Sequence, residues 1–155
     1  MAVLTDAMKA MVQRTQLCYV ATATPDGKPN LSPKGSLAVW DDNTLVFADI
    51  ASPGTIANLE VNPAIEINIV DPFLRKGYRF AGRASVVSEG DTFRTVKDQL
   101  QRKHGPRLPV NHVVIVHVDR AASLISPAYM VQPDISEDEV QRTWRGIYGV
   151  RLDTE

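Results

Sequence analysis

Short segments that alternate apolar and polar residues recur along most of this chain, and they constrain its fold more than any other feature. A period of two residues is that of a β-strand with one buried face. In residues 64–70, for example, three isoleucines alternate with Glu66 and Asn68. Such segments, bounded by turn residues, predict six strands, at residues 17–24, 29–40, 44–49, 64–70, 78–87 and 111–118.

Apolar residues at helical spacing predict four helices outside these strands, at residues 5–16, 52–62, 91–104 and 136–148. In the second helix we expect Ser52 at the N-cap and Pro53 at the first helical position. Ser136 and Glu139 have the spacing of a capping box at the start of the fourth. Each helix thus has a residue suited to its N-terminus or C-terminus.

Six strands joined mostly by short turns indicate a mainly β protein of the α+β class. The expected architecture is a six-stranded antiparallel barrel with peripheral helices, rather than a doubly wound parallel sheet. A chain of 155 residues is long enough for one hydrophobic core. We therefore expect a single domain over residues 1–155, with a C-terminal tail from about residue 122 to residue 155.

The composition excludes several classes of protein. Charged residues make up 23% of the chain and the net charge is -1, which does not suggest a broadly basic nucleic-acid binder. No apolar run approaches the roughly 18 residues of a membrane helix, and the first 16 residues are too polar for a secretory signal. We expect a cytoplasmic protein whose single cysteine, Cys18, is a buried thiol rather than a nucleophile.

Four polar residues occupy alternate positions of the second predicted strand: Asn30, Ser32, Lys34 and Ser36. Their side chains should emerge on one face of a regular strand. An amide, two hydroxyls and an ammonium group supply donors that a phosphate or a polar heterocycle can use. Taken alone, the pattern is more typical of a solvated outer face, and Pro33 suggests an edge or a bulge.

The predicted helix at Ser52 begins with a second element suited to an anion. The amides of a first helical turn have no partner inside the helix, and the helix dipole favours negative charge there. Gly54 permits close approach of a ligand and Thr55 adds a hydroxyl. A simple helix cap is the commoner explanation of such a segment, so the case for a site needs both elements together.

Several segments, in their order and spacing, resemble the FMN-binding core of the pyridoxamine 5'-phosphate oxidase-like proteins. They are residues 20–23 (VATA), 26–29 (DGKP), 47–50 (FADI), 52–59 (SPGTIANL), 62–63 (NP) and 78–84 (YRFAGRA). The resemblance covers roughly residues 5–120. It implies a split β-barrel homodimer with FMN bound at the subunit interface, in two sites per dimer.

The resemblance also implies which residues would hold the FMN. They come from two strands and the helix that follows: Ser32, Lys34, Gly35 and Ser36; Ala48, Asp49 and Ile50; and Ser52, Gly54, Thr55 and Asn58. The first group would line the ribityl phosphate and ring, and the second would run beside the isoalloxazine. In the third, the residues at the start of the helix would hold the phosphate, with the asparagine closing that side.

One departure from the family shifts the expected source of positive charge. Many relatives place one or two basic residues where this chain has Gly54 and Thr55. Amide groups can bind phosphate without a local cation, but we expect Lys34 to supply the charge here. The reserve candidates are Arg79, Arg83 and the pair Arg75 and Lys76. The deazaflavin F420 is an alternative cofactor among relatives, although they usually have a more basic groove.

The C-terminal tail departs from the true oxidase of the family. Trp144, Arg145 and residues 151–153 only faintly match its substrate-binding terminus, and no histidine follows an arginine at the end. We therefore do not expect pyridoxamine phosphate oxidation. Tyr129 and Trp144 could cover the flavin or the partner's barrel, or only anchor the tail to its own domain.

The three histidines do not predict a metal site. His112 and His117 are an odd number of positions apart on one predicted strand and should point to opposite faces. His104 ends a predicted helix, where a basic side chain suits the dipole. The basic residues around it are typical of a solvated helix end rather than a nucleic-acid site.

The sequence thus predicts an FMN-dependent oxidoreductase acting on a small molecule or on reduced nicotinamide (NADH or NADPH). Because the chemistry would belong to the flavin, no catalytic acid or base is assigned. One alternative is a flavin-binding carrier or storage protein without a substrate pocket. Another is a split barrel without flavin that serves as an interaction module.

Overall fold

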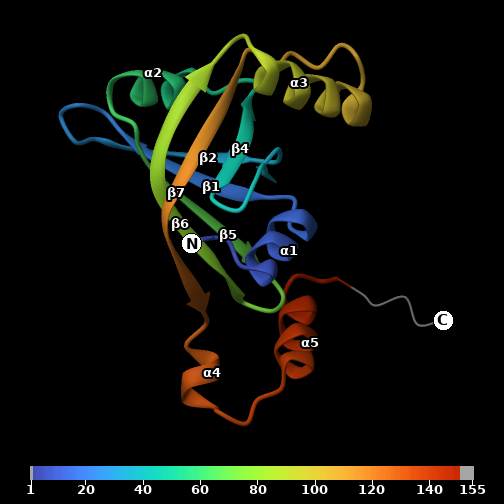
Figure 1. The fold of residues 1–155 in the computed structure, drawn as a ribbon. Helices are drawn as coiled ribbons and strands as arrows, with labels where there is room; N and C mark the ends of the chain where they lie inside the picture. Colours follow the sequence, from blue (N-terminus) through green and yellow to red (C-terminus); the bar gives the residue numbers. More distant parts are fainter. Residues whose placement is uncertain (1, 151–155) are drawn as a thin grey trace.

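Seven antiparallel strands form one curled sheet in the computed structural model, which describes residues 2–150 (Figure 1). The strands are β1 (Cys18–Ala23), β2 (Pro29–Lys34), β3 (Ala38–Val39), β4 (Thr44–Asp49), β5 (Ala64–Asp71), β6 (Lys76–Val87) and β7 (His112–Ile125). Their order in the sheet is β2-β1-β5-β6-β7-β4-β3. The two edge strands, β2 and β3, are neighbours in sequence. The three residues between them therefore bring the two edges of the sheet together.

The predicted strand over residues 29–40 is wrong in one respect, because it divides into β2 and β3. β2 pairs with β1, whereas β3 pairs with β4. Gly35 lies in the break between them, and Pro33 cannot donate a ladder hydrogen bond. The sheet therefore has seven strands where six were predicted, and β7 extends beyond its predicted end to Ile125 through its long pairing with β6.

The four predicted helices are confirmed as α1 (Asp6–Arg14), α2 (Pro53–Val61), α3 (Asp91–His104) and α5 (Glu137–Ile147). Ser52 occupies the N-cap position of α2, and the capping box of Ser136 and Glu139 is present. A fifth helix, α4 (Ala128–Val131), was not predicted because four residues are too few to show a period. In residues 2–150, no helix has the length and apolar character needed to cross a membrane.

Two hydrophobic clusters bury both faces of β4 and β7. One cluster fills the inside of the curled sheet and contains Phe47, Phe80 and Val116. The other lies under α3 and contains Val46 and Val96. Each fully buried side chain of this size contributes roughly 1.5–3 kcal/mol. β4 is thereby a well-anchored strand, and the residues that follow it start from a fixed position.

The C-terminal tail packs against the turn between β5 and β6. The guanidinium of Arg75 lies 4.0 Å from the ring centroid of Trp144, and the Tyr129 hydroxyl donates to the Leu74 carbonyl at 2.7 Å. Val140 is buried, whereas Ile147 at the end of the same predicted stripe is exposed. Within this chain, the two aromatic residues anchor the tail to its own sheet.

Candidate functional site

A cavity of about 460 Å³ opens in the gap between β2 and β4, where the two edges of the sheet meet. We call it the split cavity. Seven of the eleven predicted cofactor-binding residues line it: Ser32, Lys34, Gly35, Ser36, Ala48, Ile50 and Ser52. Its volume lies in the range of small-molecule sites. The structure thus brings together most of the two strand groups that the sequence predicted.

In the described chain, backbone donors without a protein partner occur both in the break between β2 and β3 and in the segment that follows β4. The Ser36 hydroxyl accepts from the Ala48 amide at 3.0 Å and so takes the place of a ladder partner. Within residues 2–150, the amides of Gly35, Ile50 and Ala51 donate to no protein group. These three residues line the split cavity. Their amides can therefore bind acceptor atoms of a ligand.

Lys34 is the buried charge of the split cavity, with only 8% of its surface exposed. Its Nζ donates to the Ser32 hydroxyl at 2.5 Å and to the Pro33 carbonyl at 3.4 Å. In the described part of the chain, no carboxylate lies within ion-pair distance of it. Burial lowers the pKa of Lys34, while the negative charge of Asp49 acts in the opposite direction. A bound anion would complete the environment of this ammonium group.

Asp49 fixes the chain segment that carries the free amides of Ile50 and Ala51. Its carboxylate accepts from the Ser52 amide and hydroxyl, both at 2.8 Å, and contacts His112 Nδ1 at 3.0 Å. Burial by itself would raise the pKa of Asp49, but the hydrogen bonds from His112 and Ser52 outweigh it and lower the pKa. Asp49 does not line the cavity. Its hydrogen bonds instead hold Ser52, and thereby the end of segment 50–52, in place.

The predicted phosphate-binding residues of α2 lie apart from the split cavity. Gly54, Thr55 and Asn58 do not line it. Asn30 Nδ2 donates to the hydroxyls of Thr22 at 3.2 Å and Thr55 at 3.3 Å, and Asn58 Nδ2 donates to Thr22 at 3.0 Å. These hydrogen bonds attach α2 to β1 and β2. Direct contact of the three α2 residues with a cofactor stays a prediction.

The polar face of β2 points inward. Asn30, Ser32 and Lys34 are partly or fully buried, as expected for one common face, while Leu31 on the other face is 65% exposed. The pattern therefore does not arise from a solvated outer face. Cys18 pairs with Lys34 and is buried, which raises the pKa of its thiol to about 12. The prediction of a structural thiol is confirmed.

The reserve cations are engaged elsewhere. Arg79 donates to Asn68, Arg83 pairs with Asp119, and Lys76 pairs with Glu137. Neither these three nor Arg75 line the split cavity. In the described residues, no three His, Cys, Asp or Glu side chains are grouped as a metal site.

Sequence reasoning missed the wall that α3 contributes. Leu100 and His104, one helical turn apart, line the split cavity together with Leu108. Gly105, at a φ of 104°, ends α3 and turns the chain so that Leu108 returns to the cavity. The four-residue spacing of Leu100 and His104 in the predicted helix is the sequence signal that could have placed both on one face.

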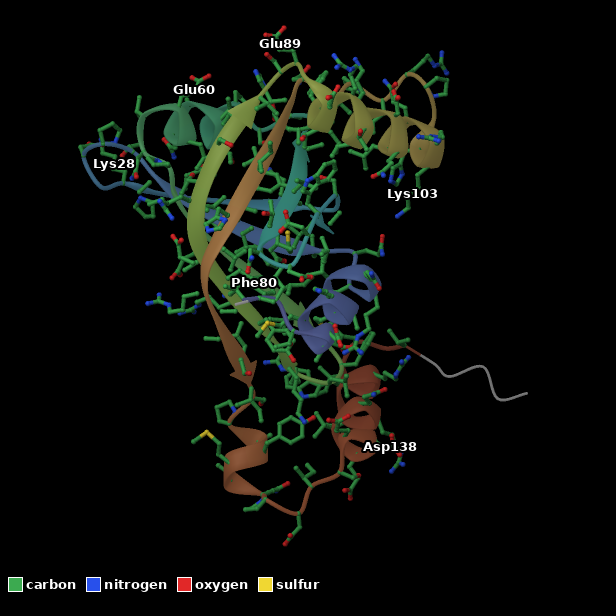
Figure 2. All side chains as sticks on the ribbon, in the orientation of Figure 1. Lys28, Glu60, Phe80, Glu89, Lys103 and Asp138 are labelled. Carbon is green, nitrogen blue, oxygen red and sulfur yellow. The ribbon has the colours of Figure 1, made fainter. Side chains whose placement is uncertain are left out.

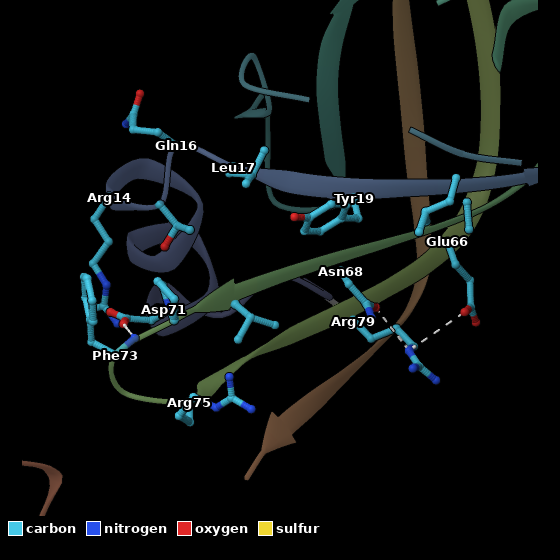
Figure 3. A pocket seen from close by; sticks show the side chains of 15 residues that line it. Arg14, Gln16, Leu17, Tyr19, Glu66, Asn68, Asp71, Phe73, Arg75 and Arg79 are labelled. Carbon is cyan, nitrogen blue, oxygen red and sulfur yellow. Dashed lines mark hydrogen bonds and ion pairs between the residues drawn. The ribbon is translucent and has the colours of Figure 1, made fainter. Parts of the chain in front are cut away.

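A larger groove of about 920 Å³, the outer groove, lies on the exposed face of the neighbouring strands β2, β1 and β5, away from the inside of the curled sheet (Figure 3). Its apolar lining includes Leu17, Tyr19, Leu31 and Val70, which are all exposed. Figure 3 shows Arg14, Arg75 and Arg79 around it. These four exposed apolar side chains lie along one face of the sheet.

Comparison with known proteins supports the fold. The family model described as pyridoxamine 5'-phosphate oxidase matches residues 4–127. The crystal structure of HupZ from Group A Streptococcus is similar at 36% identity, with a TM-score of 0.71, over 79% of this chain and 94% of that chain. No curated protein matches the chain.

Two further solved structures are similar at lower identity, which bears on the fold alone. An FMN-binding protein from Syntrophomonas wolfei is 16% identical over 77% of this chain and 85% of that chain, with a TM-score of 0.69. HutZ, the heme storage protein from Vibrio cholerae, is 20% identical over 79% of this chain and 94% of that chain, with a TM-score of 0.62. The predicted split barrel with peripheral helices is confirmed.

Proposed function

Because the chain belongs to the pyridoxamine 5'-phosphate oxidase family, we propose that it binds FMN in the split cavity and acts as an FMN-dependent oxidoreductase. The observation that carries this proposal is the ammonium group of Lys34, which is buried beside a cavity without a carboxylate partner in residues 2–150. When it is bound, FMN accepts a hydride or electrons from a small substrate or from reduced nicotinamide.

The residues of the split cavity suit the two polar parts of FMN. Lys34 and the hydroxyls of Ser32 and Ser52 can bind the phosphate with charge-assisted and neutral hydrogen bonds. The free amides of Ile50 and Ala51 can bind oxygen and nitrogen acceptors at the edge of the ring. Leu100 and Leu108 offer apolar surface to the ring and exclude water.

A second copy of this chain is the partner that we propose for the outer groove. Leu17, Tyr19, Leu31 and Val70 are 47%, 46%, 65% and 38% exposed. Four such side chains, on or beside the three neighbouring strands β2, β1 and β5, would lose contact with water in a homodimer. FMN at the interface of this dimer is part of the same proposal.

Purification tests the function directly. We expect a yellow protein that releases FMN on denaturation and is bleached by NADH or NADPH under anaerobic conditions. Bound FMN without bleaching by any electron donor would favour a flavin carrier. A colourless protein that fails to bind added FMN would overturn the proposal.

Two other cofactors are outcomes of the same experiment. A heme absorbance band would favour the storage role for which HutZ is named. A released cofactor with the mass of F420 would favour the deazaflavin. Either result contradicts FMN while leaving the split cavity as the place to search for the site.

A further inference from the structure

The buried carboxylate of Asp49 connects the split cavity to a histidine that does not line it. One carboxylate oxygen contacts His112 Nδ1 at 3.0 Å. The other accepts from the Ser52 hydroxyl at 2.8 Å, and Ser52 lines the split cavity, whereas His112 does not. The imidazole and the wall of the cavity are therefore linked through the two oxygens of one carboxylate.

The charge of Asp49 also reaches Lys34, the buried ammonium group of the split cavity. Within residues 2–150, the two groups are not within ion-pair distance of each other. Burial lowers the pKa of Lys34, and the carboxylate of Asp49 acts against this effect. A negative charge that attracts the ammonium group also repels an anion bound beside it. Asp49 therefore weakens the anion site that Lys34 forms.

His112 can change its charge in a pH range in which Asp49 does not. A histidine gains a proton between about pH 8 and pH 5. The side chain of His112 is 33% exposed, so the proton can come from water. Burial would raise the pKa of Asp49, but hydrogen bonds from His112 and Ser52 outweigh it and lower the pKa. The carboxylate thus stays ionised, and only a protonated His112 cancels its charge.

In residues 2–150, Asp49 is the only charged group within ion-pair distance of His112. The helix α3 packs on the other face of β7, because Val113 belongs to the cluster under α3 and successive residues of a strand point to opposite faces. The charged residues of α2, of the β6–α3 connection and of the segment before β7 are all exposed: Glu60, Glu89 and Arg107. Figure 2 shows Glu60 and Glu89 directed away from the body of the protein.

We propose that His112 makes anion binding in the split cavity sensitive to pH. When His112 is protonated, it cancels the charge of Asp49, and Lys34 then binds the phosphate of FMN more tightly. When His112 is neutral, the charge of Asp49 opposes the phosphate. His112 acts through Asp49 and does not touch the cofactor. This inference rests on the proposed function for the identity of the anion.

Fluorescence titration of FMN between pH 8 and pH 5.5 tests the inference in the wild type and in His112→Asn. Asparagine keeps a neutral donor for Asp49 and does not titrate. Lys34, His104 and the phosphate of FMN also bind protons, but they are the same in both proteins, so the ratio of the two dissociation constants isolates His112. We expect equal affinities at pH 8. At pH 5.5 the wild type should bind roughly threefold more tightly, as for one charge acting from a distance in a partly solvated site.

Two controls separate charge from shape. His117→Asn changes a histidine on the same strand that is exposed and lies near Asp119 rather than Asp49. It should bind FMN as the wild type does at each pH. Riboflavin is the second control, because it has no phosphate. Its affinities for the wild type and for His112→Asn should keep a constant ratio across the range.

Asp49→Asn tests the same inference from the other side of the contact. It removes the negative charge and keeps the shape of the side chain. We expect it to bind FMN roughly threefold more tightly than the wild type at pH 8, where His112 is neutral, and about equally at pH 5.5. Weaker binding than the wild type at pH 8 would show that the charge of Asp49 does not oppose the phosphate, which contradicts the inference.

A constant ratio between the wild type and His112→Asn from pH 8 to pH 5.5 would overturn the inference. The same change with pH in His117→Asn, or with riboflavin, would also overturn it. If FMN binds and any of these results is found, the inference fails and the proposed function stands. If FMN does not bind at any pH, the proposed function fails. Calorimetric titration with sulfate, whose charge is constant over this range, then decides the inference, which fails if sulfate does not bind or binds without dependence on His112.

Discussion

Lys34 donates a hydrogen bond of 2.5 Å to Ser32, its neighbour on the same face of β2, and has no carboxylate partner within residues 2–150. Two neighbouring donors thus lie on one wall of the split cavity, with a charge that the protein leaves uncompensated. Such an arrangement is unfavourable for the protein alone and favourable for an anionic ligand.

Removal of the Lys34 ammonium should weaken FMN binding. We expect Lys34→Ala to lose about 1.5–3 kcal/mol of binding free energy, which is the range for a hydrogen bond to a charged group. Fluorescence titration of FMN measures the loss. Lys28→Ala is a suitable control, because Lys28 is exposed and paired with Asp26 in the turn before β2. Equal affinity in Lys34→Ala and the wild type would remove this lysine from the site.

The same lysine should destabilise the protein when no ligand is bound. We expect Lys34→Met to raise the free energy of unfolding at pH 7 by about 1 kcal/mol, because a buried charge is replaced by an apolar side chain of similar length. Urea unfolding of the FMN-free proteins measures this. A less stable Lys34→Met protein would show that the ammonium is already well compensated.

The pH dependence of that difference follows from the lowered pKa of Lys34. The unfolded chain binds the proton more tightly, so the wild type gains stability as pH rises from the folded pKa toward the ordinary value of about 10.4. The advantage of Lys34→Met should therefore shrink between pH 7 and pH 10. A constant difference across this range would contradict the direction of the pKa shift.

Asp49 should be required for the position of residues 50–52. We expect Asp49→Ala to lower the free energy of unfolding by about 2 kcal/mol, because it leaves the Ser52 donors and His112 without their acceptor. Thermal or urea unfolding measures this loss. Asp98→Ala is the control, because Asp98 is exposed. If Asp49→Ala lowered the free energy of unfolding no more than Asp98→Ala does, the structural role of Asp49 would be contradicted.

The lowered pKa of Asp49 gives this contribution a pH window. Its stabilisation is present above the ordinary pKa of about 3.9 and is lost as pH falls through the folded value. Asp49→Asn keeps the shape of the side chain and does not titrate. The gap in stability between wild type and Asp49→Asn should therefore narrow only in acid.

Most elements of this fold could be predicted from the sequence because their signals are local. The alternation in β5 and the capping box of α5 each lie within a few residues. The break at Gly35 could not be predicted, because residues 29–40 have strand character throughout and differ only in their pairing partners. Pairing is a long-range property that one sequence does not reveal.

The candidate site likewise has parts that could be predicted from the sequence and parts that could not. The polar face around Lys34 follows from a period of two, and the structure places it in the split cavity. The contact between Asp49 and His112 joins residues 63 positions apart, and Leu108 reaches the cavity only through the turn at Gly105. The hydroxyl of Thr55 could bind a ligand, but in the structure it accepts a hydrogen bond from Asn30. Only the tertiary structure reveals this contact.

Gly82 should tolerate no side chain. A Cβ atom there would lie 2.0 Å from the His117 carbonyl oxygen, at the point where the pairing of β6 and β7 shifts register. We expect Gly82→Ala to lower the free energy of unfolding by about 3 kcal/mol, because the backbone of one strand must move. Gly146→Ala is the control, since a Cβ in α5 meets nothing within 4 Å. It should be neutral or stabilise by up to about 1 kcal/mol.

Leu31 should be required for the proposed homodimer. It is 65% exposed and lines the outer groove, so a charge there would be buried against the second copy. We expect the wild type to have the mass of a dimer in light scattering and Leu31→Lys to have that of a monomer. Val61→Lys is the matched control, because Val61 is 64% exposed at the end of α2 and does not line the groove.

The FMN affinity of Leu31→Lys reports where the cofactor lies. If FMN binds at the subunit interface, the monomeric variant should bind it at least about tenfold more weakly, although Leu31 does not line the split cavity. Val61→Lys should bind FMN as the wild type does. A Leu31→Lys protein that is still a dimer would show that the second copy binds another face. A monomer with full FMN affinity would show that one chain holds the cofactor by itself.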